Sequence, residues 1–360
     1  MTVLLPRSGT GPAPYPGTGQ GRDRRRRRRA SVGRRVWLWW VEVLVGSAAL
    51  VALTTTLTAW PSPVPARAMP AGIALVRSGL VIDDPFKVPA SVRQLEDHYV
   101  FNGSAHPGAG WVAASAKGLG VGIRQHRGWA GWFAVTIPSA GAATLWHVDM
   151  TRPSGAVPGG EGEAVFAVQS ASTQRNGSIN YVIVSSLTDG DRSTWQVGSA
   201  RGVVADASSH MLWRAPFGTG SPVTFPVTIR TDGRHTLTVW LGDREVYSSH
   251  HLDMHDPPPF QAYLEVQAKN AGYVARFSDF WVTDASPVTV EGAPPRAWVE
   301  LEIGSRHVVS RADRAGQAEL QVPPAEAVGT GTLVVHAGTV TRHFPNLHYA
   351  AGDVLELSDG

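Results

Sequence analysis

Cysteine is absent from the 360-residue sequence. Its absence excludes disulfide scaffolds, cysteine-ligated zinc, iron–sulfur clusters and thiol nucleophiles. Charged residues are also scarce, at 17%, whereas Gly and Pro are abundant, with 39 and 26 copies. Short strands joined by many turns suit this composition better than long solvent-facing helices do. The composition therefore predicts an all-β chain with one or two domains.

Lysine is nearly absent, with three copies against 29 arginines, a ratio that indicates high-GC codon usage and a bacterial origin. The net charge of +3 is unevenly distributed. Residues 1–60 hold ten arginines and two acids, a net charge of +8 that leaves −5 for the remaining chain. This remainder has no cationic surplus to attract phosphates, so we expect no nucleic-acid partner.

An apolar segment, residues 36–60, follows the arginine cluster. As a helix it would be about 37 Å long, enough to cross a hydrocarbon core of about 30 Å. The positive-inside rule then makes residues 1–35 a disordered cytoplasmic tail and puts the later domains outside. The alternative is an export signal cleaved after Ala68, which would release a secreted protein.

The remaining chain divides into a Pro-rich spacer at 61–74, a large β domain at 75–286 and a small β domain at 287–360. The large domain contains short runs with period-2 alternation, bounded by turn residues such as Asp232-Gly233. Such runs are typical of strands in a sandwich. We expect strands near 132–137, 144–150, 164–169, 179–185, 193–197, 223–230, 235–241, 260–267 and 273–282.

Residues 231–283 carry a family resemblance: the hairpin LTVWLGDREVY, a Pro-rich crossing, an apolar strand and a closing FSDFWV strand. This order resembles the second half of concanavalin A-like lectin and glucanase domains, the laminin-G-like jelly roll. The resemblance implies a sheet with a concave, solvent-facing side that holds sugars. Alternation puts Tyr263, Glu265 and Gln267 on one side of their strand, so they are candidate ligand-binding residues.

Trp129 and Trp132, in the stretch GWAGWF, are further candidates because exposed rings can stack on a sugar. Burial in the core is the alternative for both. The small domain resembles the prealbumin-like or carboxypeptidase-regulatory β-sandwich, whose roles are spacing and adhesion. That resemblance implies no catalytic residue.

The E-x-D-x-E strand of glucanases is absent. Two carboxyls on one strand face would be needed for retaining hydrolysis. The nearest acid pairs are Glu161 with Glu163 and Glu300 with Glu302, which we interpret as solvated strand edges. We therefore expect no catalytic residue.

His251, Asp253 and His255 have the period-2 spacing of a three-ligand metal site, although solvated residues of a crossing loop are the alternative. We assign no cofactor. Calcium is a candidate without an assigned site, since acids occur at Asp83, Asp84, Asp97, Asp189 and Asp191.

Together these features predict a single-pass, signal-anchored surface protein that binds carbohydrate or a cell-envelope component without catalysis. One alternative is a glycoside hydrolase or lyase of the concanavalin A-like fold. A second is a structural module that binds another protein. The sequence leaves the oligomeric state open.

Overall fold

The computed structural model describes residues 67–84, 86, 99–103, 110–124, 129–136, 144–154, 161–170, 181–189, 192–201, 208–216, 224–252, 260–269 and 272–358. These residues form β-strands and turns, together with one 3₁₀ turn, η2 (Pro324–Glu326). The all-β prediction is confirmed. The predicted cytoplasmic tail and membrane segment lie outside the described residues. Within the ranges given above, no helix has the length and apolar character needed to cross a bilayer.

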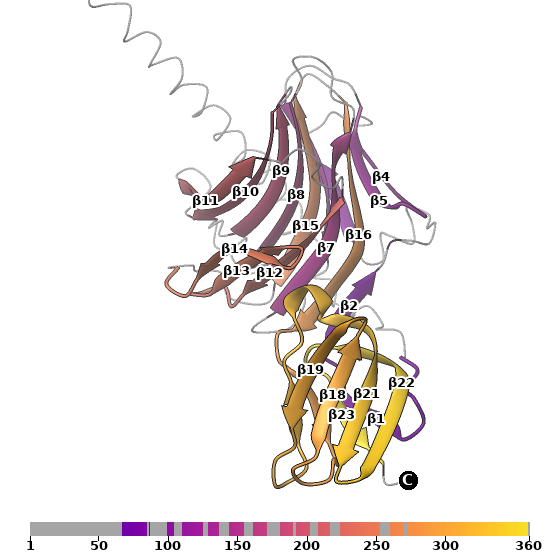
Figure 1. Ribbon diagram of the computed structural model, residues 1–360. Helices are drawn as coiled ribbons and strands as arrows, with labels where there is room; N and C mark the ends of the chain where they lie inside the picture. The colour runs from indigo at the N-terminus through magenta and orange to yellow at the C-terminus, as the bar shows by residue number, and fades with distance from the viewer. Residues whose placement is uncertain are drawn as a thin grey trace, which may run out of the picture.

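Two antiparallel sheets form a large sandwich (Figure 1). The seven-stranded sheet contains, in spatial order, β11 (Ser208–Pro216), β10 (Arg192–Arg201), β9 (Tyr181–Asp189), β8 (Glu161–Ser170), β15 (Phe260–Lys269), β6 (Trp129–Thr136) and β3 (Tyr99–Gly103). The eight-stranded sheet contains β14 (Arg244–Ser249), β13 (Leu237–Leu241), β12 (Thr224–Thr231), β7 (Thr144–Ser154), β16 (Tyr273–Asp284), β5 (Gly118–Ile123) and β4 (Gly110–Ser115), with β2 (Leu80–Asp84) paired to β16.

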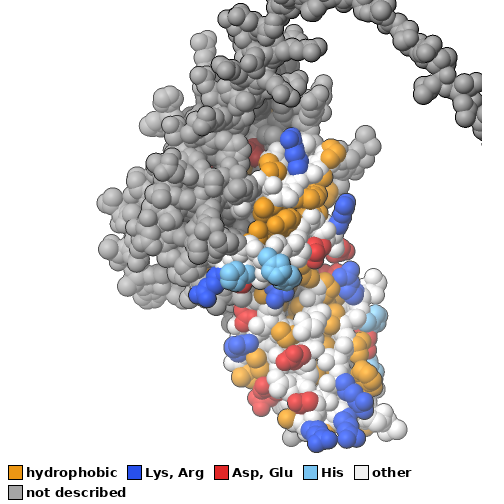
Figure 2. Space-filling model, turned by 90° about the vertical axis from the view of Figure 1, so that its left-hand side faces the viewer, with side chains coloured by type: hydrophobic (Ala, Val, Ile, Leu, Met, Phe, Trp, Pro, Cys, Tyr) orange, Lys and Arg blue, Asp and Glu red, His pale blue; other side chains and the backbone are white. Residues whose placement is uncertain are grey.

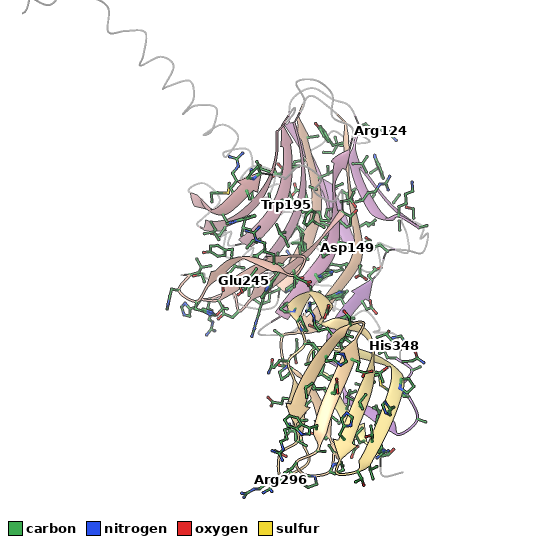
Figure 3. The ribbon with its side chains drawn as sticks, in the orientation of Figure 1. Arg124, Asp149, Trp195, Glu245, Arg296 and His348 are labelled. Carbon is green, nitrogen blue, oxygen red and sulfur yellow. The ribbon has the colours of Figure 1, made fainter. Side chains whose placement is uncertain are left out.

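The core of the large sandwich lies between these two sheets and follows the predicted alternation. On β15 the side chains that enter the core are Phe260, Ala262, Leu264, Val266 and Ala268. Burying apolar area of this kind stabilises a fold by roughly 25 cal/mol per Å². Figure 3 shows Trp195, which packs in the same core with an exposed fraction of 4%.

Two glycines of β5 make room for a tryptophan of the neighbouring strand. A Cβ atom on Gly122 would lie 2.2 Å from the ring of Trp111, and one on Gly120 would lie 3.1 Å from it. The Gly-x-Gly-x-Gly spacing at 118–122 is therefore a packing feature of a strand. A side chain at either position would displace the Trp111 ring.

A small sandwich completes the fold. One of its sheets contains β1 (Ile73–Arg77), β23 (Val354–Leu357), β17 (Val288–Glu291) and β20 (Ala318–Leu320). The other contains β19 (Arg306–Arg311), β18 (Trp298–Ile303), β21 (Val328–Ala337) and β22 (Val340–Ala350). Their shared core includes Val290, Leu301 and Leu355.

The small sandwich is discontinuous in sequence, which corrects the predicted boundaries. The spacer was expected to end at residue 74 and the large domain to begin at 75. Instead β1 pairs antiparallel with β23, joining Ile73 to Leu357 and Leu75 to Leu355. Met69 also packs against the small core. The large sandwich is thus inserted between the first and second strands of the small one.

A buried ion pair joins the two ends of the small sandwich. The guanidinium of Arg67 donates two hydrogen bonds to the carboxylate of Asp353, at 2.8 and 2.7 Å. The same carboxylate accepts the backbone N–H of Gly79 at 2.8 Å and that of Ala350 at 2.7 Å. The Asp353 side chain is fully buried. Its charge is balanced by these donors, and removing Arg67 alone would leave it uncompensated.

The two sandwiches meet at an apolar junction. Leu80, Leu145 and Trp281 of the large sandwich pack with Ala327, Ala350 and Ala351 of the small one. At the rim, Arg306 lies 3.5 Å from the carboxylate of Asp243 and 3.5 Å from that of Glu326. These contacts fix the small sandwich against the base of the large one.

Candidate functional site

The outer face of the seven-stranded sheet, turned away from the core, carries a row of polar side chains on β15. We define the β15 polar face as this row plus one glutamate of the adjacent strand: Gln261, Tyr263, Glu265, Gln267 and Glu163. The register pairs Gln267 with Glu163, which makes Glu265 a diagonal neighbour of that carboxyl. Two adjacent central strands thus bring two carboxyls and the carboxamide of Gln267 together, whereas Gln261 lies six residues away along β15, opposite Gln169.

The side chains predicted to face solvent are buried. Tyr263 and Glu265 are 2% exposed, Gln267 is 1% exposed and Glu163 is 5% exposed. β15 is a central strand of its sheet, between β8 and β6. Alternation predicted that these side chains share one face, but it could not predict that this face is covered.

Hydrogen bonds orient these groups in pairs along β15. The Gln267 amide donates to a carboxyl oxygen of Glu265 at 3.1 Å, and the Gln261 amide donates to the Tyr263 hydroxyl at 2.8 Å. The amide oxygen of Gln261 has no hydrogen-bond partner among the described residues. A buried acceptor without a partner is costly, and Gln261 is fully buried, so a ligand hydroxyl could reach this oxygen only after the atoms that cover it move aside.

Burial raises the pKa of Glu265 to about 8. The hydrogen bond from Gln267 acts in the opposite direction, and the charge of Glu163 raises the pKa further. At neutral pH Glu265 is therefore mostly a neutral carboxylic acid. Such a group donates through its O–H and accepts through its carbonyl oxygen, whereas an ionised carboxylate only accepts.

Further polar side chains lie toward a more exposed edge of the sheet, beyond an apolar interruption. The register links Glu265 through Val165 on β8 and Ser185 on β9 to Gln196 on β10 and Arg214 on β11. Gln196 donates to Thr194 at 3.3 Å, and Arg214 is exposed. At 4.7–4.9 Å between strands, β11 lies roughly 19 Å from β15 across the sheet.

A second buried polar group lies on the eight-stranded sheet. His147 stacks on Trp281, with ring centroids 4.5 Å apart and an interplanar angle of 5°, and its Nδ1 contacts the Thr228 hydroxyl at 2.8 Å. Burial lowers the pKa of His147 to about 3, so the ring is neutral. Because Trp281 belongs to the junction between the sandwiches, this histidine has a packing role.

The other predicted ligand-binding and metal-binding residues fall largely outside the described residues. Trp129 and Trp132 lie on β6, and their side chains lie outside the described part of the chain. His251 is exposed, whereas Asp253 and His255 lie outside the described residues.

Among the calcium candidates, Asp83 is exposed, and its pKa is raised by partial desolvation, with further increases from the charges of Asp279 and Asp84. The candidates Asp97 and Asp191 lie outside the described residues, as does the side chain of Asp189.

Glu163 and Gln261 were missed by the sequence analysis. Glu163 was interpreted as part of a solvated edge because Gly162 interrupts the acid pair. In the structure Gly162 faces the core, where a Cβ atom would lie 2.2 Å from the ring of Tyr273. The glycine therefore maintains the strand alternation that directs Glu163 to the β15 polar face. Gln261 was detectable, since it continues the alternation of Tyr263, Glu265 and Gln267.

No protein-family model matches the chain, and no curated protein is a significant match. Solved structures with a similar arrangement include LamAcat from Zobellia galactanivorans, at 9% identity and TM-score 0.40, covering 57% of this chain and 97% of that one. The potassium-bound carbohydrate recognition domain of Emp46p matches at 12% identity and TM-score 0.42, covering 56% and 96%. The β-glucanase of Bacillus licheniformis matches at 8% identity and TM-score 0.39, covering 57% and 98%. Values this low transfer no function to this chain.

Proposed function

We propose that the large sandwich is a concanavalin A-like module that binds carbohydrate on the β15 polar face. One observation carries this proposal: Glu265, held neutral by burial, lies in a row with carboxamides and a phenol. Each of these groups both donates and accepts hydrogen bonds. A sugar hydroxyl does the same, so each ligand hydroxyl can both donate a hydrogen bond to one of these groups and accept one from another. An anionic or purely apolar ligand would use the row less well.

The test is a glycan array with the full chain in detergent, followed by titration of any ligand found. Replacing Gln261 with Leu removes the unpartnered acceptor and the donor to Tyr263. We expect binding to weaken about tenfold or more, because a lost hydrogen bond to a buried group costs roughly 1–3 kcal/mol. Gln317→Leu, an exposed position in the small sandwich, is the matched control.

Unchanged affinity in Gln261→Leu would overturn the assignment of the face. A full array without any bound glycan would instead favour the third possibility, a structural module that binds another protein.

Glycoside hydrolysis is the second candidate function, and the pairing of a neutral Glu265 with Glu163 favours it. A carboxyl with a raised pKa can protonate a leaving oxygen, while a second carboxylate activates water or attacks. Glu265→Gln separates the two functions, because Gln has the shape and neutrality of the protonated acid but transfers no proton. A binding module keeps its affinity in this variant. A hydrolase keeps binding and loses turnover by about 10²–10⁴-fold.

We also infer that the chain remains anchored through residues 36–60, with an extracytoplasmic large sandwich. The support is the apolar length of that segment and the use of Arg67 by the folded small sandwich. Cleavage after Ala68 would remove Arg67 and leave Asp353 as an uncompensated buried charge, at a cost of about 3–5 kcal/mol. N-terminal sequencing of the membrane-bound protein tests this inference, and a mature chain beginning at Met69 would contradict it.

A further inference from the structure

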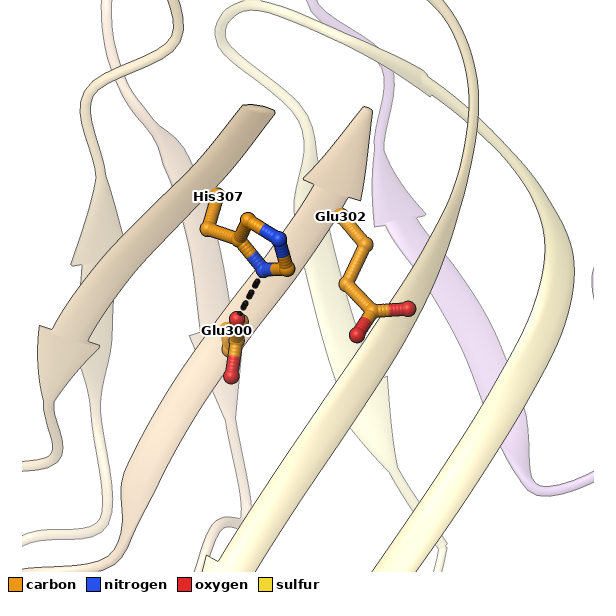
Figure 4. A group of neighbouring side chains, drawn as sticks. All are labelled: Glu300, Glu302 and His307. Carbon is orange, nitrogen blue, oxygen red and sulfur yellow. Dashed lines mark hydrogen bonds and ion pairs between the residues drawn. The ribbon is translucent and has the colours of Figure 1, made fainter. Parts of the chain in front are cut away.

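A group of histidine and glutamate side chains lies on the sheet β19-β18-β21-β22, far in sequence from the β15 polar face. We define the His–Glu cluster as Glu300 and Glu302 of β18, His307 of β19 and His336 of β21. Figure 4 shows the first three, with the imidazole of His307 directed at Glu300 and the carboxylate of Glu302 on the same side. One ligand atom from each of these three lies within 4.8 Å of the others.

Strand register, rather than loop conformation, brings the cluster together. His307 is paired directly with Glu302 across β18 and β19. His336 is paired with Trp298, which places it diagonal to Glu300. The Glu300 carboxylate contacts both histidines: one oxygen bonds Nδ1 of His307, and the other lies 3.6 Å from Nε2 of His336. The ligand atoms therefore come from three hydrogen-bonded strands of a rigid sheet.

The two glutamates have no lysine or arginine partner among the salt bridges of the described residues. Elsewhere on the small sandwich acidic and basic side chains intermix (Figure 2), and Arg306, on β19, pairs with Asp243 and Glu326. Arg311, also on β19, instead covers the ring of Trp298 at 5.6 Å from its centroid. Arg306 and Arg311 are thus directed away from the cluster. Among the described residues, the two carboxylates lie beside two imidazoles and form no salt bridge with lysine or arginine.

We propose that this cluster binds a divalent first-row transition metal, with zinc as its representative. Imidazole nitrogen and carboxylate oxygen are the ligands that zinc takes when cysteine is absent. Calcium and magnesium prefer sites built from oxygen alone, so the imidazoles select against them. Exposed fractions of 55% for His307 and 42% for His336 leave the cluster open to a metal from solution.

The observed spacing requires only small side-chain movements. Ligands at about 2.0–2.2 Å from a tetrahedral zinc lie roughly 3.3–3.6 Å apart, so the side chains must close from within 4.8 Å. His307 is half-exposed and can rotate freely enough to do so. The metal would also replace the contacts that Glu300 now makes with both histidines. Coordination by three of the four side chains leaves a position for water.

The experiment is a titration of the metal-free full chain, in detergent, with Zn²⁺ against a competing chelating indicator. We expect one high-affinity site, and no binding of Mg²⁺ or Ca²⁺ at this site. His307→Ala should weaken zinc binding by at least about 100-fold, because even the loss of an outer-shell partner costs 10–100-fold. Glu302→Gln and His336→Ala should each weaken it as well.

Two histidine variants locate the site. His348→Ala removes an exposed histidine of the same sheet that bonds Thr330 instead of the cluster, and it should leave the affinity unchanged (Figure 3). His251→Ala should also leave it unchanged. The proposal is overturned if zinc does not bind, if His307→Ala binds as tightly as the natural chain, or if His251→Ala abolishes binding. Thermal unfolding of each metal-free variant verifies that it is folded.

Discussion

Glu163 on β8 and Glu300 on β18 belong to acid pairs with the same spacing, Glu161 with Glu163 and Glu300 with Glu302, but the two side chains lie in different environments. Glu163 is 5% exposed and raises the pKa of the buried Glu265. The Glu300 carboxylate is 20% exposed and contacts two exposed histidines. The spacing is identical, so the difference comes from the sheet around each strand. Glu163 thus raises the pKa of a buried neighbour, whereas Glu300 is partly exposed and contacts two imidazoles.

The residue between the two acids faces the core in both pairs. On β8 this residue is Gly162, which lies against the ring of Tyr273, and on β18 it is Leu301, which is fully buried. On β8 the ring of Tyr273 fills the space beside Gly162, whereas on β18 the side chain of Leu301 fills the core itself. Each strand can therefore be tested by substituting the core residue between the two acids as well as by substituting polar residues on the opposite face.

The largest expected effect is on the buried side. Because the folded pKa of Glu265 is about 8 against an ordinary 4.5, the folded state holds this proton more tightly. The resulting stabilisation is complete below about pH 4.5 and is lost as pH rises through 8. Glu265→Gln stays neutral, so its free energy of unfolding should exceed that of the natural chain by an amount that grows with pH. The growth from pH 5 to pH 9 is on the order of 4 kcal/mol.

Urea unfolding of both proteins across this pH range measures the difference. His147 titrates in the opposite sense, with a folded pKa of about 3, and destabilises both proteins equally as pH falls below about 6.5. It therefore cancels in the comparison. Parallel pH profiles for the two proteins would mean that Glu265 is solvated.

Truncation of Leu301 has the next largest expected effect. Leu301→Ala should lower the free energy of unfolding by about 2–5 kcal/mol, because it removes buried methyl groups and leaves a cavity in the small core. Chemical unfolding measured by circular dichroism gives this number. A loss below about 1 kcal/mol would show that the small core collapses around the cavity.

Enlargement of Gly162 should have a somewhat smaller effect. A Cβ atom at this position would overlap the ring of Tyr273, so Gly162→Ala should destabilise the large sandwich by about 1–3 kcal/mol. Gly304→Ala is a control with open space around it, although its positive φ of 57° adds backbone strain. If Gly162→Ala left the free energy of unfolding unchanged, the contact with Tyr273 would not explain the glycine.

The smallest expected effect is on the partly exposed pair, Glu300 with Glu302. Glu300→Gln removes a charge that is partly solvated, and pairs of this kind contribute about 0–1 kcal/mol to stability. We therefore expect its unfolding midpoint to stay close to that of the natural chain without metal, while its zinc affinity falls. A large loss of stability in metal-free Glu300→Gln would make the His–Glu cluster a structural element.

Local pattern predicted much of this fold. Each of the nine strand segments expected in the large domain overlaps an observed strand, and the Asp232 carboxylate accepts the backbone N–H groups of Arg234, His235 and Thr236 in the expected turn. Alternation also assigned Leu264 and Val266 to the core. These features depend on residues close together in the sequence, so short windows suffice to find them.

The remaining features depend on which strands become neighbours. The burial of Glu265 depends on what covers the outer face of its sheet, and the His–Glu cluster requires β18 between β19 and β21. The pairing of Ile73 with Leu357 joins positions near opposite ends of the chain. Without pairing information the first strand of the small sandwich was interpreted as the end of a spacer.

The small sandwich is discontinuous in sequence, since β1 precedes the large sandwich and its partner β23 follows it, and this affects the order of folding. Arg67 and Asp353, 286 positions apart, cannot meet until nearly all of the chain has been synthesised. Closing so long a loop in an unfolded chain is slow. Prior folding of the inserted sandwich shortens the search, since β2 and β16, at its entry and exit, are paired neighbours. We therefore expect the small sandwich to complete its strand pairing after the large sandwich has folded.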